Sequence, residues 1–417
     1  MTETTTGHAA RTYLIATLDT KGAEIGFVRD RLRSLGVETV VVDAGCQGQP
    51  AIRADVSRES VFEAAGTTLS EMRSMGDRGL AVTRAAGGVS AIVARDHAAG
   101  RVAGVLAVGG SAGTTIGTAA MRSLPVGVPK LMVSTLASGQ VRPYVRDKDV
   151  LMLNPIVDIS GLNRVSRAVL SEAAAAMAGL VKFRAEPRSP EEDRPIVAAT
   201  MFGVTTPCVE RARKVLEEAG LEVLVFHATG TGGQAMESLV KDGLVAGVLD
   251  VTTTEIADEV AGGFLSAGPE RLTAAAERGV PQVVSVGATD MVNFHGIETV
   301  PERYAKRRLH RHNENVTLMR TTPEENARIG EDIAKKVARS KGPAAILLPL
   351  RGVSAIDREG EPFDDPAARE SLFGAIRAHR GSVELVEIDA HVNDPAFAEA
   401  AARKLLALLP APARRPR

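Results

Sequence analysis

The sequence has no tryptophan, and aromatic residues make up only 3% of its 417 residues. Hydrophobic residues still account for 44%, so we expect a core built from alanine, valine, leucine and isoleucine. Only two cysteines occur, Cys46 and Cys208, in separate halves of the chain. They form neither a disulfide framework nor a CxxC zinc pattern, and we therefore expect a reducing, cytoplasmic location.

Excess charge and long apolar runs are also missing. The formal net charge is −1, and no run of lysine and arginine marks a basic surface. We therefore expect no nucleic-acid partner. The chain has no stretch of about 18 consecutive apolar residues, the length that a membrane span requires. Its start, MTETTTGHAARTY, has no apolar signal segment, so we expect neither secretion nor a membrane partner.

Short β-branched runs alternate with alanine-rich amphipathic stretches along the chain. The pattern predicts strands at 12–18 and 37–45 around a helix at 23–36, followed by strands at 101–108 and 130–135. A strand–helix–strand order implies right-handed crossovers and a parallel sheet. The predicted fold class is therefore α/β.

The pattern restarts in the second half of the chain. VAGVLAV (102–108) matches VAGVLDV (245–251), and RTYLIAT (11–17) resembles RPIVAAT (194–200); in each half a Gly-Val-Pro then precedes a strand. Three matches in the same order favour an internal duplication over chance similarity among buried strands. We therefore predict two doubly wound, Rossmann-like parallel-sheet domains, at 1–183 and 194–417, joined by a polar, proline-rich linker at 184–193.

Glycine and hydroxyl residues follow the predicted strands of the first half, where ligands of open parallel sheets bind. The loops are 19–22, 43–48, 109–115 and 134–139. In the third loop, AVGGSAGTT, glycines let the backbone approach a ligand, and the N–H groups of a helix beginning near Thr114 favour an anion. The candidate ligand-binding residues are Asp19, Thr20, Lys21, Gly109, Gly110, Ser111, Gly113 and Thr114.

The glycine loop has no lysine of its own. We expect Lys21 to supply the positive charge, and Asp19 to bind magnesium or a ribose hydroxyl. GGSAG matches neither GxxxxGK[ST] nor GxGxxG, and tight turns alone would explain its glycines. It meets the G-x-S-x-G pattern of a serine hydrolase, although no Asp…His order follows in the first half. A phosphate ligand and a structural turn both stay open at this point.

The second half contains another glycine loop. Residues 230–235 fit the G-x-G-x-x-A dinucleotide fingerprint, with Asp250 at the end of the next strand. The fingerprint normally follows the first strand of a domain, however, and this loop follows the second. The alternative interpretation is a second anion-binding loop with His227 and Glu237 at its mouth.

Polar residues then concentrate in 286–296, 308–322 and 348–357. Histidine suits acid–base chemistry near neutral pH, and arginine binds carboxylates and phosphates. A solvated helix face would explain RLHRHNEN (308–315) equally well, and its two histidines are too close in sequence for a helical metal-binding pair. The candidate catalytic residues, for an enzyme acting on a small anionic or carbonyl metabolite, are His227, Asp290, His312 and Arg320.

At ATLDTKGAEIGFVRDRLRSLGVETVVVDAG, GVLAVGGSAGTTIGTAAM and FHATGTGGQAME, the sequence resembles the Tm-one-like ATP-binding proteins. This family is named for a tomato protein that inhibits tobamovirus RNA replication. The resemblance spans nearly the whole chain, through NVTLMRTT and PLRGVSAID. It implies a two-domain, Rossmann-like homodimer with ATP, accompanied by magnesium, at the loops of the first domain. The antiviral role belongs to a plant lineage and is not implied for this chain.

Three hypotheses follow from these patterns. The first is an ATP-binding protein, and the second is an enzyme that uses the polar groups of the second half. The third is a pure interaction protein, but protein-binding surfaces are enriched in aromatic anchors, of which this chain has few.

Overall fold

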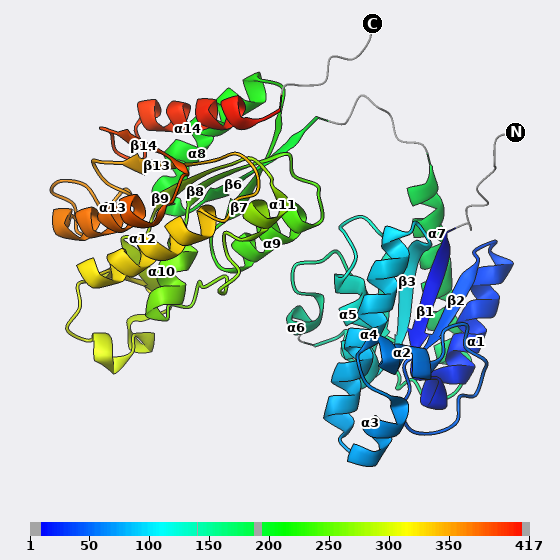
Figure 1. The fold of residues 1–417 in the computed structure, drawn as a ribbon. Coiled ribbons are helices and arrows are strands. Elements are labelled where there is room, and N and C mark those ends of the chain that lie inside the picture. Colours follow the sequence, from blue (N-terminus) through cyan, green and yellow to red (C-terminus); the bar gives the residue numbers. More distant parts are fainter. Residues whose placement is uncertain (1–9, 140, 187–193, 411–417) are drawn as a thin grey trace, which may run out of the picture. The chain divides into compact units, whose positions relative to one another are not determined.

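The computed structural model describes residues 10–139, 141–186 and 194–410. The chain divides after Arg188 into two compact units, here called the first and second domain (Figure 1). Of the predicted linker, residues 184 and 185 continue helix α7 (Arg164–Ala185), and residues 187–193 lie outside the described residues.

The first domain is built on a five-stranded parallel sheet in the order β2-β1-β3-β4-β5. The strands are β1 (Arg11–Ala16), β2 (Thr39–Asp43), β3 (Val102–Gly109), β4 (Lys130–Ser134) and β5 (Leu151–Leu153). The other helices of this domain are α1 (Leu18–Ser34), α2 (Arg58–Ala64), α3 (Leu69–Met75), α4 (Arg78–Ala98), α5 (Ser111–Arg122) and α6 (Arg142–Val145).

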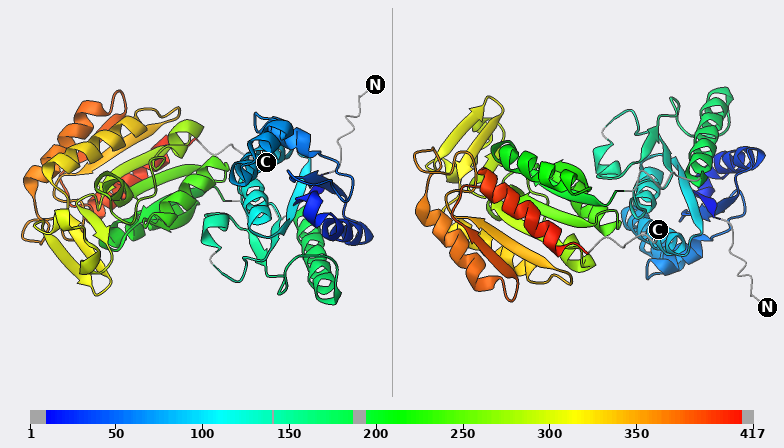
Figure 2. Two further views of the ribbon diagram at one scale, coloured as in Figure 1. Left: turned by 90° about the horizontal axis from the view of Figure 1, so that it is seen from below. Right: turned by 90° about the horizontal axis from the view of Figure 1, so that it is seen from above.

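The side chains of β1 point alternately to the two faces of the sheet, and both faces are buried. Leu14 and Ala16 pack with α1 and α7, whereas Tyr13 and Ile15 pack with α2, α4 and α5. Successive side chains of a strand point to opposite faces, so a nearly continuous apolar run fills both layers. The two further views in Figure 2 show each sheet between helices.

The second domain has a six-stranded parallel sheet in the order β14-β13-β9-β8-β6-β7. Its strands are β6 (Ile196–Met201), β7 (Glu222–His227), β8 (Gly247–Thr252), β9 (Gln282–Gly287), β13 (Ala344–Pro349) and β14 (Glu384–Ile388). Its helices are α8 (Thr206–Glu218), α9 (Thr231–Lys241), α10 (Thr254–Ala261), α11 (Ala274–Arg278), α12 (Pro323–Val337), α13 (Pro366–His379) and α14 (Pro395–Leu408).

Both domains have the predicted α/β parallel-sheet architecture, and their strand orders agree. When only the strands of the parallel sheets are numbered in chain order, the first five are arranged 2-1-3-4-5 in both domains, and the second domain adds β14 beyond β13. An internal duplication would produce this shared order, which is also a common order among doubly wound folds.

The second domain also contains a small antiparallel sheet that the sequence pattern did not predict. This sheet contains β10 (Met291–Phe294), β11 (Leu309–Asn313) and β12 (Val316–Arg320), in the order β10-β12-β11. RLHRHNEN is therefore part of a β-hairpin and not a helix face. The helices of the described ranges include none that combines the length and apolar character needed to span a bilayer.

Candidate functional site

A cleft of about 390 Å³ opens at the carboxyl ends of β1, β2 and β3 in the first domain. The strand order changes direction between β1 and β3, which is where open α/β sheets bind their ligands. The lining residues come from the starts of α1, α4 and α5 and from the loop after β2: Thr17, Asp19, Thr20, Ala44, Cys46, Gln47, Arg78, Ala81, Val82, Ala112 and Ile116.

The segment DTKG is the first turn of α1 and not the loop that the sequence pattern predicted. The helix begins at Leu18, after Thr17. The Leu18 amide donates to the Asp43 carboxylate at the end of β2, 3.0 Å away, which satisfies one of the free amides of the helix start. The helix start is thus fixed by a residue 25 positions later, a contact that local sequence does not reveal.

Two of the predicted ligand-binding residues, Asp19 and Thr20, do line the cleft. The Thr20 hydroxyl lies 2.7 Å from that of Thr17. One carboxylate oxygen of Asp19, Oδ2, accepts from the Gln47 amide at 2.9 Å. The other, Oδ1, is buried without a hydrogen-bond partner among the described residues. Asp19 therefore has one oxygen with an unused acceptor position, and this oxygen is closed to solvent in the structure.

Lys21 is directed elsewhere. Its ammonium donates to the Ile159 carbonyl, in the segment before α7, and it does not line the cleft. The cation that lines the cleft is Arg78, the first residue of α4. Arg78 is exposed and makes no ion pair or hydrogen bond with any residue in the described ranges. Arg78 was not among the predicted ligand-binding residues, although Asp77 before it is a typical helix N-cap residue.

The glycine loop forms the start of α5, which begins at Ser111 and not near Thr114. The amides of Ser111, Ala112 and Gly113 donate to no residue that the structure describes. Gly110 is the N-cap, without a capping side chain. Because Ala112 lines the cleft, an anion there can accept from this free helix turn.

The remaining residues of this loop have structural roles. A Cβ atom on Gly109 would lie 2.7 Å from the Gly113 Cα, so the close approach of β3 and α5 requires glycine at position 109. Thr114 is fully buried, and its hydroxyl donates to the Gly110 carbonyl and contacts the Ser134 hydroxyl. Its hydroxyl is therefore held within the protein, while Ser111 is exposed beside the cleft.

The glycine loop of the second domain already holds an anion from the protein itself. The Glu255 carboxylate accepts from the amides of Gly230 and Gly233 at the start of α9, at 2.7 and 3.0 Å. Arg271 binds the other oxygen of Glu255 at 2.6 Å. It also forms two hydrogen bonds with Asp250, the residue that the dinucleotide fingerprint would assign to ribose. The internal carboxylate thus occupies the position of an external anion.

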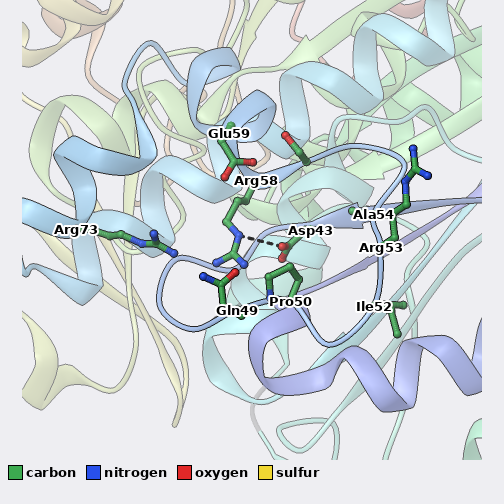
Figure 3. A pocket seen from close by; sticks show the side chains of 10 residues that line it. Asp43, Gln49, Pro50, Ile52, Arg53, Ala54, Arg58, Glu59 and Arg73 are labelled. Atoms are coloured by element: carbon green, nitrogen blue, oxygen red, sulfur yellow. Dashed lines mark ion pairs between the residues drawn. The ribbon is translucent and has the colours of Figure 1, made fainter.

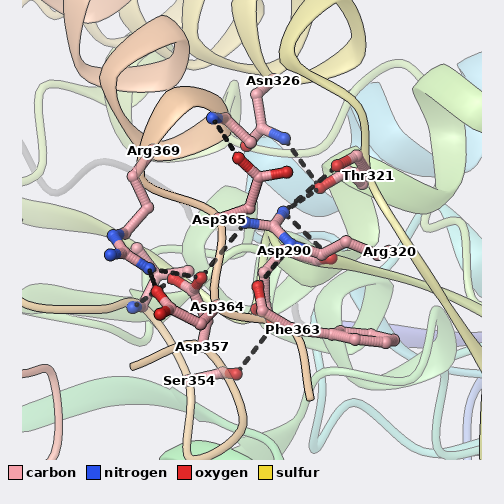
Figure 4. Close-up of polar contacts among 12 residues, drawn as sticks. Asp290, Arg320, Thr321, Asn326, Ser354, Asp357, Phe363, Asp364, Asp365 and Arg369 are labelled. Atoms are coloured by element: carbon pink, nitrogen blue, oxygen red, sulfur yellow. Dashed lines mark hydrogen bonds and ion pairs between the residues drawn. The ribbon is translucent and has the colours of Figure 1, made fainter. Parts of the chain in front are cut away.

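Asp290 and Arg320 lie together in a buried polar cluster of the second domain (Figure 4). Arg320 donates to the Asp290 carbonyl at 3.3 Å and to the Asp357 carboxylate at 3.1 Å. The Asp290 carboxylate accepts from the Ser354 hydroxyl at 2.8 Å, and its Oδ1 has no partner in the described part of the chain. Burial, followed by repulsion from Asp357, raises the pKa of Asp290 to about 7.

The two candidate catalytic histidines lie outside this cluster. His227, at the end of β7, is exposed and stacks on Phe202 with ring centroids 5.4 Å apart. His312 is exposed on β11. The structure therefore brings together two of the four candidates, Asp290 and Arg320. The buried histidine near them is His391, whose ring contacts the Ser354 carbonyl, and the sequence analysis did not select it.

Comparison with known proteins covers both domains. Residues 10–186 match the N-terminal domain, and residues 194–409 the C-terminal domain, of an uncharacterised protein family, UPF0261. A UPF0261 protein of Clostridium tetani is 48% identical over 95% of this chain and 98% of its own length. UPF0261 protein RA0729 of Rhizobium meliloti is 48% identical over 94% and 97%.

The predicted resemblance to the tomato resistance protein is confirmed. The ToMV resistance protein Tm-1(GCR237) of Solanum lycopersicum is 38% identical over 98% of this chain, which corresponds to 57% of the tomato protein. With matches of this extent in both halves, the chain belongs to the UPF0261 family.

Proposed function

We propose that the cleft of the first domain binds ATP through its phosphates. The observation that carries the proposal is the free first turn of α5, which has three unbonded amides and reaches the cleft at Ala112. A helix start of this kind binds anions through its amides and its dipole. Arg78 adds a guanidinium without an ion-pair partner in the described structure. The cleft volume of about 390 Å³ lies within the range of about 300–1,000 Å³ that is usual for small-molecule sites.

The same cleft suits a magnesium ion held together with the phosphates. Magnesium in nucleotide sites usually binds one or two carboxylates, substrate phosphates and water. Asp19 offers one buried carboxylate oxygen without a described partner. Thr17 and Thr20, whose hydroxyls lie 2.7 Å apart, line the same cleft. When bound, the ion would neutralise phosphate charge, and Asp19 is the residue that would hold it.

Calorimetric titration of the full-length protein with ATP and magnesium tests this proposal. Arg78→Gln removes a charge-assisted hydrogen bond, so we expect binding to weaken by about tenfold. Gly110→Val places a side chain beside the free helix turn and should also weaken binding. Lys21→Met is the matched control, because its ammonium is bound to Ile159, and it should keep the wild-type affinity. Absence of ATP binding by the wild type would overturn the proposal.

The alternative function, an enzyme acting on a small anionic or carbonyl metabolite, has one observation in its favour. Asp290 combines an unpartnered oxygen with a pKa raised by burial, as a general acid requires. However, Asp290 and Ser354 are completely buried and Arg320 is 4% exposed, so a substrate would reach them only after the surrounding loops had moved. A metabolite screen in which wild type and Asp290→Asn give the same profile would eliminate this alternative.

We also infer a cytoplasmic homodimer, in line with the family resemblance. Both cysteines are free thiols in the structure, and they lie in different domains. Light scattering should give a mass of twice the 43.7 kDa of one chain; a mass of one chain would contradict the dimer.

A further inference from the structure

A second cavity, of about 350 Å³, lies in the first domain beyond the end of β2 (Figure 3). It is bordered by the segment between β2 and α2 and by Arg73 of α3. None of its lining residues lines the cleft described above. Neither the ATP hypothesis nor the family match assigns it a ligand.

The charged residues of this cavity are mostly arginines. Arg53, Arg58 and Arg73 stand against the two carboxylates of Asp43 and Glu59, which leaves one net positive charge. The Asp43 carboxylate is already engaged, because the Arg58 Nε lies 3.2 Å from its Oδ2 and both side chains are buried. Arg53 is exposed and has no ion pair or hydrogen bond to the described residues. The Arg53 guanidinium is therefore free to bind a ligand in the cavity.

The loop at 46–48 separates this cavity from the ATP cleft. Arg73 donates to the carbonyls of Cys46 and Gln47, at 2.7 and 2.8 Å, and Arg58 donates to the Gly48 carbonyl at 2.7 Å. Cys46 and Gln47 themselves line the cleft. The arginines of the cavity thus hold the backbone of a loop that forms one wall of the neighbouring site.

Asp43 provides a second link between the two sites. Its Oδ2 faces Arg58 of the cavity, and its Oδ1 accepts from the amides of Leu18 and Gly45. The Leu18 amide starts α1, which carries Asp19 and Thr20 into the cleft. A change in the position of Arg58 therefore acts on both α1 and the loop.

We propose that this arginine-lined cavity binds a small oxyanion, carrying a carboxylate or phosphate group, and that its occupancy changes nucleotide affinity in the cleft. Guanidinium groups bind both kinds of anion through paired N–H donors. An anion that draws Arg73 or Arg58 toward itself weakens their bonds to the loop carbonyls. Anion binding stands independently of the ATP hypothesis, whereas the effect on nucleotide affinity rests on it.

Titration of the full-length protein with inorganic phosphate and with succinate, at low ionic strength, tests anion binding. Arg53→Gln should weaken one binding component by about tenfold, because a charged donor is lost from an exposed, unpaired position. Arg78→Gln, the matched control at the cleft, should leave that component unchanged. The preferred probe identifies the anion class. If no component for either probe depends on Arg53, the site does not exist.

The second measurement compares ATP affinity with and without a saturating concentration of the preferred probe. We expect a shift in ATP affinity for the wild type and none for Arg53→Gln. An equal shift in both proteins means that the probe competes inside the cleft, and this result overturns the coupling. If no variant binds ATP but the Arg53-dependent component remains, the ATP proposal fails and the anion site stands.

Discussion

In the second domain, the side chain of Glu255 takes the place of an external anion, and Arg271 holds it there. The fully buried side chain of Arg271 binds Glu255 and Asp250, and Glu237 lies 3.4 Å from it. Glu255 in turn occupies the amides at the start of α9. A buried charge is tolerated only where partners surround it, and here every charge has one. The second domain therefore has one helix start, that of α9, whose amides are occupied by an internal carboxylate.

Glu255→Gln should strongly destabilise the second domain. The substitution removes the carboxylate that pairs with Arg271 and accepts from the Gly230 and Gly233 amides, and breaking a buried ion pair costs about 3–5 kcal/mol. Urea unfolding followed by circular dichroism would measure the change in the free energy of unfolding. Asp389→Asn is the control, because its ion pair with Arg351 is exposed and should contribute little to stability. Equal effects of the two substitutions would contradict the ionic role of Glu255.

Asp290 should make stability depend on pH in an unusual direction. Its pKa is raised from 3.8 to about 7 in the folded protein, chiefly by burial, so the folded state binds more protons than the unfolded state between these values. Its contribution to stability is therefore complete below pH 3.8 and is lost as the pH rises to about 7.

Asp290→Asn removes this titration. The difference in unfolding free energy, wild type minus variant, should fall with rising pH by at most about 1.4 kcal/mol per pH unit and level off above pH 7. Urea unfolding at several pH values measures it. The difference also cancels the contribution of Asp258, whose pKa burial likewise raises to about 7. A difference that is constant with pH would contradict the raised pKa.

At the scale of elements, α5 depends on close packing against β3 and β4. A Cβ atom on Gly117 would lie 2.5 Å from the Ala107 Cβ and 3.0 Å from the Met132 Sδ. Gly87, inside α4, has no atom within 4 Å of the corresponding position. A side chain would therefore clash with neighbouring atoms at Gly117, whereas it would meet open space at Gly87.

The two helix glycines should respond to alanine with opposite signs. Gly87→Ala should stabilise the first domain by about 1 kcal/mol, the helix-propensity gain. Gly117→Ala gains the same amount but meets overpacking of about 1–3 kcal/mol, so its net effect should be destabilising. Thermal and urea unfolding of the two variants would measure both effects. A stabilised Gly117→Ala protein would show that α5 can move away from the sheet.

Some of these elements could be predicted from the sequence and others could not, for physical reasons. The first four strands of the first sheet were predicted because burial on both faces requires continuous apolar runs, as in β1 and β3. The start of α1 was placed at residue 23 instead of Leu18, because Asp43 on another strand stabilises it. Of the cleft, Asp19 and Thr20 were predicted from their place after β1. Arg78 was missed because it does not directly follow a strand in the sequence, and only the folded structure brings the start of α4 to the cleft.

At the scale of the whole molecule, two domains share a strand order but differ at their switch points. Gly110 is the N-cap of α5 after β3, and Thr253 is the N-cap of α10 after β8. Two positions later the first domain has Ala112, which lines the cleft, and the second has Glu255, which binds the α9 amides. After a duplication, a carboxylate at this position would close one site and leave the other open. We therefore expect that an external anion would bind to the first domain and not to the second.

Each domain should fold and act separately. Each has its own parallel sheet and its own buried clusters on both faces of that sheet. We expect fragments 10–186 and 194–410 to unfold cooperatively in urea, as single domains of this size usually do. The first fragment should bind ATP within about threefold of the full-length affinity, a difference of less than about 1 kcal/mol, because every residue of the cleft belongs to it. Calorimetry on both fragments measures this, with the second as the non-binding control. ATP binding by the second fragment alone would transfer the site to the second domain.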